Sequence, residues 1–350
     1  MRVVAKSAGA ALPASRWVRK LAYGLLLGLP LPLFLLGLAI GRYPIDLPDV
    51  GRVLISPLFP AAATGIPDVA KNLVLLVRLP RALAGLLIGA SLASTGAAFQ
   101  GIFKNPLVDS NLLGVTSGAG FGAALMILLT GDPLYIQLSA FAFGLLAVGL
   151  AFFGSRLYGA APMIVLTLMG ILIGSLFGSL TSLLKYVADP LDELPAITFW
   201  LLGGLNTVTW RDIPALAVIT VSGAGFLWLL RWRFNILSLG DPEATALGIN
   251  PTQLKLAIIV CATLMTAAAV SVGGVIGWVG LVMPHAGRIL VGPDHRRLLP
   301  ASLSLGAAFL LLIDNISRTL LPAEVPLGVL TGLIGVPILV LLLRRNRVGW

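Results

Sequence analysis

Apolar stretches long enough to cross a membrane recur along the whole chain and constrain its fold more than any other feature. A helix needs about 20 apolar residues to cross the hydrocarbon core of a bilayer. Charged residues, proline or turn residues bound each stretch. We therefore predict an all-α, polytopic membrane protein with about ten transmembrane helices. The predicted spans are residues 21–41, 82–99, 112–130, 134–155, 163–185, 213–232, 254–272, 275–290, 299–317 and 325–343.

The composition excludes a water-soluble domain. Hydrophobic residues make up 58% of the chain and charged residues 11%, with a mean hydropathy of +0.99, whereas about 25% of the residues in a soluble domain are charged. The net charge of +10 does not indicate nucleic acid, because Lys and Arg flank the apolar stretches instead of forming a stripe with aromatic residues. We expect residues 1–350 to form one transmembrane domain in contact with membrane lipid.

The basic residues predict an orientation. With the N-terminus inside, the inner segments hold 16 Lys and Arg against four Asp and Glu, and the outer segments hold eight against ten. The positive-inside rule then favours an N-in, C-in topology, with residues 1–20 as a cytoplasmic tail. No small-residue cleavage site follows the first stretch, so we expect an uncleaved span. Residues 42–81, rich in proline and small residues, are expected along the outer face.

The predicted cytoplasmic loop 234–252 carries signals for a short helix. Asp241 suits an N-cap, Pro242 the first helical position, Glu243 the positive end, and Gly248 the stop. A helix of one to two turns in this loop is too short and too polar to span. It is either a loop helix alone or a helix that docks in another protein's groove, and the pattern leaves both open.

Arg78 and Arg81 precede the second predicted span, in the sequence Arg-Leu-Pro-Arg on the outer side. Arginines at a bilayer edge often extend to lipid headgroups. They can also serve as fixed cations for carboxylates on a soluble partner.

Glycines recur on one face of the fifth predicted span. Gly170, Gly174 and Gly178 lie four residues apart, with Thr167 and Ser182 near the same face. Small residues let helix backbones approach closely in lipid, so a packing seam is the first interpretation. A face lining a transport pathway or a subunit contact is the second, and both can hold together.

Residue patterns for enzyme chemistry are absent from the sequence. The glycines of 114–122 have no following Lys-Ser or Lys-Thr, so they form no phosphate-binding loop. His285 and His295 lack the companions of a zinc site, and Cys261 lies within an apolar stretch. We expect no enzyme activity and no metal site. Two other classes of protein are alternatives. A secondary carrier needs an ionisable residue near the middle of the membrane, and Asp314, near an outer helix end, is a poor candidate for it. An intramembrane enzyme would have to use His285 as its base, and the sequence shows no evident nucleophile to act with it.

Several segments, in this order and spacing, resemble the iron-chelate and vitamin B12 importer permeases, the FecCD-type family of type II ABC importers. They cover about three quarters of the chain. The matching segments are Arg78–Arg81, Gly96–Leu107, Leu113–Gly120, Phe199–Gly204, Leu239–Gly248, Gly277–His285 with Arg288, Gly292–Pro300 and Glu324–Gly328.

The resemblance implies a homodimer in the bacterial inner membrane, with two cytoplasmic ABC ATPases and a periplasmic or lipid-anchored binding protein. It implies no cofactor in this chain, because the partner ATPases bind ATP and Mg²⁺. Ferric siderophore is the expected cargo, with haem or cobalamin as alternatives. Two departures from the family pattern are Val108-Asp109-Ser110 and Gly159–Met163, where the vitamin B12 permease has Ser and Thr; the second makes cobalamin a weaker candidate.

Site residues follow from the same resemblance. Arg78, Arg81 and Arg318 match cations that meet glutamates of the binding protein. Residues 238–250 match the ATPase contact. Its named members are Leu239, Gly240, Asp241, Pro242, Glu243 and Gly248. The fifth and tenth helices and a short helix near 195–204 match the walls of the pathway. The pathway residues are Thr167, Gly170, Gly174, Gly178, Ser182, Thr331 and Gly335.

Overall fold

The computed structural model describes residues 16–157 and 163–345, and within these residues all regular secondary structure is helical. The helices are α1 (Arg16–Gly28), α2 (Pro30–Ala39), α3 (Leu47–Ile55), η1 (Pro60–Ala63), α4 (Asp68–Asn72), η2 (Leu73–Arg78), α5 (Leu79–Phe103), α6 (Val115–Leu129), α7 (Pro133–Arg156), α8 (Met163–Val187), α9 (Glu193–Leu202), α10 (Ile213–Leu239), α11 (Asp241–Ala246), α12 (Pro251–Gly273), α13 (Val279–Val291), α14 (His295–Thr319) and α15 (Leu327–Arg345). Most of the predicted tail and residues 159–162 of the second departure lie outside the described residues.

Every predicted span coincides with a helix, but the helices differ in length. Within residues 16–157 and 163–345, seven helical segments are long and apolar enough to cross a membrane. They are Lys20–Ala39, Asp68–Phe103, Pro133–Arg156, Met163–Val187, Ile213–Leu239, Pro251–Gly273 and His295–Thr319. The helices at the other three predicted spans, α6, α13 and α15, are shorter. The all-helical, multi-pass fold is confirmed, and the count of ten spans stays a prediction.

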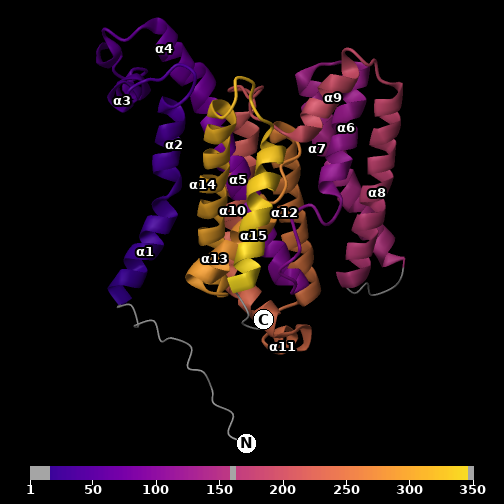
Figure 1. Ribbon diagram of the computed structural model, residues 1–350. Helices are drawn as coiled ribbons and strands as arrows, with labels where there is room; N and C mark the ends of the chain where they lie inside the picture. Colours follow the sequence, from indigo (N-terminus) through magenta and orange to yellow (C-terminus); the bar gives the residue numbers. More distant parts are fainter. Residues whose placement is uncertain (1–15, 158–162, 346–350) are drawn as a thin grey trace, which may run out of the picture.

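Helix α5 forms the centre of the bundle (Figure 1) and packs against α10, α12, α13 and α14. Two of these contacts are backbone against backbone. A Cβ at Gly96 would lie 1.9 Å from Gly280 O, and a Cβ at Gly89 would lie 2.3 Å from Gly306 O. Glycine is therefore required at these crossings, since any side chain would overlap the neighbouring main chain.

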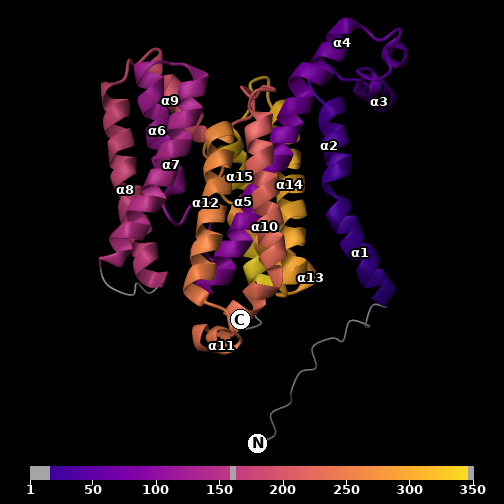
Figure 2. The same ribbon diagram turned by 180° about the vertical axis from the view of Figure 1, so that it is seen from behind.

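Two groups of helices flank this centre. Helices α6, α7, α8 and α9 form one side, and α1 with α2 stands at the other, in both views (Figures 1 and 2). Helix α1 ends at Gly28 and α2 begins at Pro30, because Pro30 and Pro32 have no N–H for the helical ladder. Residues 16–20 were predicted to belong to the cytoplasmic tail, but they are helical. Helix α1 begins at Arg16, four residues before Lys20.

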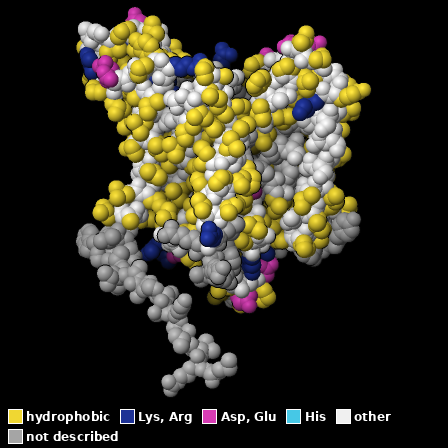
Figure 3. Space-filling view, viewed as in Figure 1, with side chains coloured by type: hydrophobic (Ala, Val, Ile, Leu, Met, Phe, Trp, Pro, Cys, Tyr) yellow, Lys and Arg dark blue, Asp and Glu magenta, His cyan; other side chains and the backbone are white. Residues whose placement is uncertain are grey.

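Charged side chains gather towards the two ends of the bundle, and hydrophobic side chains cover its middle (Figure 3). One end carries α11, the start of α1 and the end of α15, and we name it the α11 end (Figure 1). The opposite end carries α3 and α4, and we name it the α4 end. Both described termini thus lie on one side, as the predicted topology requires; which side faces the cytoplasm stays a prediction.

Candidate functional site

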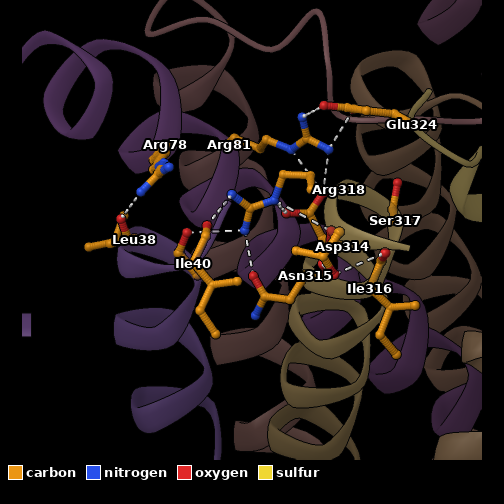
Figure 4. Close-up of polar contacts among 12 residues, drawn as sticks. Leu38, Ile40, Arg78, Arg81, Asp314, Asn315, Ile316, Ser317, Arg318 and Glu324 are labelled. Atoms are coloured by element: carbon orange, nitrogen blue, oxygen red, sulfur yellow. Dashed lines mark hydrogen bonds and ion pairs between the residues drawn. The ribbon is translucent and has the colours of Figure 1, made fainter. Parts of the chain in front are cut away.

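The three arginines predicted to dock a binding protein lie together at the α4 end, where α2, α5 and α14 meet (Figure 4). Arg78 ends η2, Arg81 lies in the first turn of α5, and Arg318 lies in the last turn of α14. Their exposed fractions are 5%, 6% and 9%. We name these arginines, with Asp314 and Glu324, the arginine cluster.

Asp314 and Glu324 hold Arg81 from two sides. Arg81 Nε donates to Asp314 Oδ1 at 2.9 Å, and its two terminal nitrogens donate to the two oxygens of Glu324 at 3.0 and 2.9 Å. The other oxygen of Asp314 lies 3.2 Å from Arg318 Nε. A buried carboxylate thus bridges two guanidinium groups, an arrangement in which loss of one partner leaves uncompensated buried charge.

Arg78 and Arg318 bind main-chain carbonyl groups at the end of α2. Arg78 Nη1 donates to Leu38 O at 2.8 Å and to Ala39 O at 3.0 Å. Arg318 Nη2 donates to Gly37 O at 3.0 Å, and Nη1 donates to Ile40 O at 3.3 Å. The last carbonyls of a helix have no partner within it, so these arginines satisfy them and fasten α2 to the bundle.

The arginine cluster therefore has a structural role, because it connects α2, α5, α14 and the segment that carries Glu324. Three guanidinium groups and two carboxylates give the arginine cluster a net formal charge of +1. Direct docking through Arg78, Arg81 and Arg318 is not tested by this geometry and stays a prediction. The pairing of Asp314 with two arginines was not predicted from the sequence, although an acid inside an apolar stretch is itself a signal of a buried partner.

The short helix predicted in the cytoplasmic loop is present as α11, which projects from the bundle (Figure 1). Helix α10 continues to Leu239, so residues 240–250 connect it to α12. One detail of the prediction is wrong. The N-cap position is Gly240, and Asp241 is the first helical residue, whose carboxylate binds Lys255 Nζ at 2.7 and 2.8 Å.

The end of α11 and its exposed surface follow from the sequence. Gly248 takes a left-handed φ of +78° and stops the helix, as predicted. Ala244 packs inward, whereas Pro242 and Glu243 are exposed. Leu239 and Leu247 flank the helix at 65% and 60% exposure. A short helix with exposed leucines at both ends suits a partner's groove better than water.

The glycines on one face of α8 differ in their surroundings: the first two pack against other backbone, and the third lies at the surface. A Cβ at Gly170 would lie 2.5 Å from Leu112 O, and Gly174 lies against Gly114 at the start of α6. Gly178 has nothing within 4 Å, and Ser182 one turn later is exposed.

The remaining predicted pathway residues all have contacts within the chain. Thr167 is half-buried and donates to Met163 O at 3.0 Å. Thr331 is buried and donates to Gly328 O at 3.1 Å. A Cβ at Gly335 lies 3.0 Å from Trp278 Cβ. Their pathway role stays a prediction.

His295 has structural contacts. Its ring stacks on Phe234, with 5.3 Å between centroids, and its Nδ1 lies 3.1 Å from Asn235 Oδ1. These contacts join the start of α14 to α10. Among the described residues, no group of three or more His, Cys, Asp or Glu is placed to hold a metal ion.

Comparison with known proteins identifies a family. The profile of the FecCD transport family matches residues 27–345. The molybdate import system permease protein MolB of Haemophilus influenzae is 39% identical over 331 residues, covering 94% of this chain and 97% of that protein. A probable iron chelatin transport system permease protein of Helicobacter pylori is 40% identical over 277 residues, covering 79% of this chain and 83% of that one.

A solved structure agrees in fold. An ABC transporter assigned to the metal-chelate type, in an inward-facing conformation, superposes with a TM-score of 0.83 at 36% identity, over 93% of this chain and 99% of that one. The family match and the identity over nearly the whole length leave no other assignment: this chain belongs to the FecCD transport family and is a membrane transport subunit rather than an enzyme.

Proposed function

We propose that this chain is the permease subunit of an ATP-driven ABC importer that moves a metal chelate, foremost a ferric siderophore, across the bacterial inner membrane. In this proposal two copies form a homodimer around the pathway. Two ABC ATPases bind at the α11 end, and a periplasmic or lipid-anchored binding protein delivers cargo at the α4 end.

The observation that carries the proposal is α11. It is a short helix at one end of the bundle, held to α12 by the Asp241–Lys255 pair, with Leu239 and Leu247 exposed beside it. Such a helix can transmit a rigid-body movement of a motor protein to α10 and α12, because both helices continue from it with short connections. The importer then alternates between two packings of the bundle as ATP binds and is hydrolysed.

The cargo assignment rests on chemistry and on the relatives. Charged residues are nearly absent from α8 and α15 over Met163–Val187 and Leu327–Leu342; Lys185, in the last turn of α8, is the exception. Walls without charge suit a bulky chelate, whose metal is wrapped by its ligand. Haem and cobalamin stay the alternatives, because relatives are named for both. The relative named for molybdate adds an oxyanion as a further candidate.

Uptake into vesicles tests the proposal. The chain is reconstituted with its ATPase and binding protein, and entry of ⁵⁵Fe-siderophore and of radioactive molybdate is measured with and without ATP. We expect ATP-dependent entry of the chelate that stops when the binding protein is omitted. Entry without ATPase would support a secondary carrier, and entry of molybdate alone would overturn the cargo class but not the importer.

Docking through the arginine cluster is a separate part of the proposal. Glu324, with 36% of its side chain exposed, occupies the outward edge of Arg81 with two hydrogen bonds. A glutamate from the binding protein can reach Arg81 only by displacing it. The docking role of this arginine therefore requires an exchange of one carboxylate for another.

A further inference from the structure

A cavity of about 370 Å³ opens on the side of the bundle between α1, α2, α5, α10 and α14. Leu27 and Pro30 line it at the break between α1 and α2, with Leu86 from α5, Trp228 from α10 and Leu303 from α14. Figure 2 shows α10 and α14 on the same side of the bundle as α1. The cavity belongs to none of the candidate sites described above.

The walls are apolar apart from two serine hydroxyls, both engaged in hydrogen bonds, and the indole N–H of Trp228. Ser94 Oγ donates to Ala90 O at 2.7 Å within its own helix. Ser304 Oγ donates to Leu26 O at 2.7 Å, a carbonyl in the last turn of α1. An occupant of this cavity is therefore apolar where it touches the walls.

Basic and aromatic side chains stand at the rim that faces the α11 end. The Arg231 guanidinium lies 3.8 Å from the ring centroid of Trp228, a wall residue. Arg297 precedes the wall residue Leu299 by two positions, and its main-chain carbonyl accepts a hydrogen bond from Tyr23 OH at 3.4 Å. The charges of Arg297 and Arg231 both act on Tyr23, which places the two guanidinium groups near this residue. Arginine with half-exposed Tyr and Trp is typical of the membrane–water interface.

The depth of the cavity fits one leaflet. From Arg297 to Ala307, the deepest wall residue on α14, ten residues of helix rise about 15 Å. Half of the hydrocarbon core is also about 15 Å. The cavity thus begins one turn from the arginines and ends near the middle of a membrane centred on the bundle.

We propose that this cavity binds one acyl chain of an anionic phospholipid, whose phosphate lies against Arg231 and Arg297. The surrounding lipid tails are as apolar as the cavity walls, so an acyl chain gains little free energy by moving from the bilayer into the cavity. Its contribution is to fill the shape of the cavity. The headgroup supplies the selectivity, because basic pockets between helices attract anionic headgroups, each Arg raising binding about fivefold. The lipid fills the gap at the break and holds α1 against α10 and α14.

Retention of lipid by the full-length chain in detergent tests the proposal, with native mass spectrometry as the readout. The probes are phosphatidylglycerol and phosphatidylethanolamine with identical acyl chains. We expect preferential retention of phosphatidylglycerol. Arg231→Gln with Arg297→Gln lowers its apparent affinity about 25-fold and abolishes the preference.

A second variant tests the cavity without touching charge. Gly225 lines the cavity, and a Cβ there meets nothing within 4 Å, so the leucine of Gly225→Leu has room to start into the cavity and occupy part of it. We expect this variant to lose bound phosphatidylglycerol. The matched controls are Gly149→Leu on α7, also without a neighbour within 4 Å, and Arg211→Gln at the α4 end.

Three results would overturn the proposal. They are equal retention of the two lipids by the unaltered chain, retention in Gly225→Leu equal to that in Gly149→Leu, and loss of the homodimer in Gly225→Leu while lipid stays bound. The last result would assign the cavity to a second copy of the chain. Gel filtration of each variant separates loss of lipid from loss of fold.

Discussion

At the scale of single residues, Asp314 holds the α4 end together. Its two oxygens contact Arg81 and Arg318 at 2.8 and 3.2 Å, and its side chain is 3% exposed. Without this carboxylate, two guanidinium groups would face each other in a buried site. The contacts that fasten α2 and the Glu324 segment to the bundle converge on these arginines.

Replacing Asp314 tests this directly. Asp314→Asn keeps the shape and removes the charge, so we expect a loss of about 3–5 kcal/mol in the free energy of unfolding. The measurement is thermal unfolding in detergent. The control is Asp68→Asn, which breaks an exposed pair with Lys71 and should change little. Equal shifts in both variants would contradict a central role for Asp314.

A change at Glu324 distinguishes the structural role of Arg81 from its proposed docking role. Its side chain is partly exposed, so Glu324→Gln should change stability little, while Arg81 keeps a charge that Glu324 no longer neutralises. If Arg81 docks a carboxylate of the binding protein, affinity should rise about five- to tenfold. Surface plasmon resonance measures this affinity, with Asp49→Asn, which removes the carboxylate paired with Arg52, as the control. Unchanged affinity would remove Arg81 from the docking surface.

Sequence reasoning located these arginines but not their environment. Arg-Leu-Pro-Arg at a span boundary indicated outer cations, and the structure places all three at one end. Their burial depends on α2, whose carbonyls lie 40 positions from Arg78 in the chain, and on Asp314, 233 positions from Arg81. Such pairings between distant segments leave no local pattern, so composition and periodicity could not reveal them.

At the scale of helices, the closest glycine-mediated approaches are not on the face predicted as a packing seam. That face is the glycine row of α8, whereas the shortest of these backbone contacts join α5 to α13 and α14 through Gly96 and Gly89. With 40 glycines in the chain, spacing alone cannot tell which of them meet another backbone. The helices themselves were predictable, because each apolar stretch and its boundary residues lie within one segment.

A pair of alanine substitutions measures the difference. Gly96→Ala forces a Cβ to within 1.9 Å of Gly280 O, so we expect destabilisation of about 1–3 kcal/mol or more from overpacking. Gly178→Ala meets nothing within 4 Å and should be neutral or slightly stabilising, since Ala favours helix over Gly. Thermal unfolding distinguishes the two. A stable Gly96→Ala protein would mean that α5 and α13 can separate at low cost.

Helix α11 allows a test of coupling that spares the bundle. Gly248 has φ +78° and no neighbour within 4 Å, so Gly248→Val acts only through the backbone, at about 1–2 kcal/mol. We expect ATPase affinity to fall about tenfold or more while the unfolding temperature of the permease hardly changes. Gly149→Val, at a helical position without neighbours, is the control. Unaltered ATPase binding would show that α11 is not the contact.

At the scale of the whole molecule, two large apolar faces remain uncovered. In α8, 17% of the most apolar window is buried, and Leu333 on α15 is 67% exposed. Lipid covers such faces on any membrane protein, so exposure alone does not distinguish lipid from a second subunit. The sequence could predict an apolar helix here, but it could not say which side meets a partner.

Crosslinking decides between them for α8. In a Cys261→Ser background, Gly178→Cys places one thiol on the uncovered face, and oxidation should give a disulfide-linked dimer if α8 lies near the two-fold axis. Leu25→Cys on α1, also exposed, is the matched control and should stay monomeric on denaturing gels. A dimer from Leu25→Cys alone would move the axis to the opposite side of the bundle.

The bonds from Arg78 and Arg318 to the end of α2 have a consequence for how the chain can change over generations. Both arginines donate hydrogen bonds to main-chain carbonyl oxygens of residues 37–40, and every amino acid has such an oxygen. The hydrogen-bonded part of the attachment therefore does not depend on which side chains α2 carries, apart from Gly37, whose Cβ would lie 3.1 Å from Asn315. The apolar part does depend on them, because Leu38 and Ala39 are buried in a hydrophobic cluster that includes Ala82 and Leu311. We therefore expect grafted α1–α2 segments from relatives to seat without compensating changes in the bundle where they keep glycine at position 37 and apolar residues of similar size at positions 38 and 39.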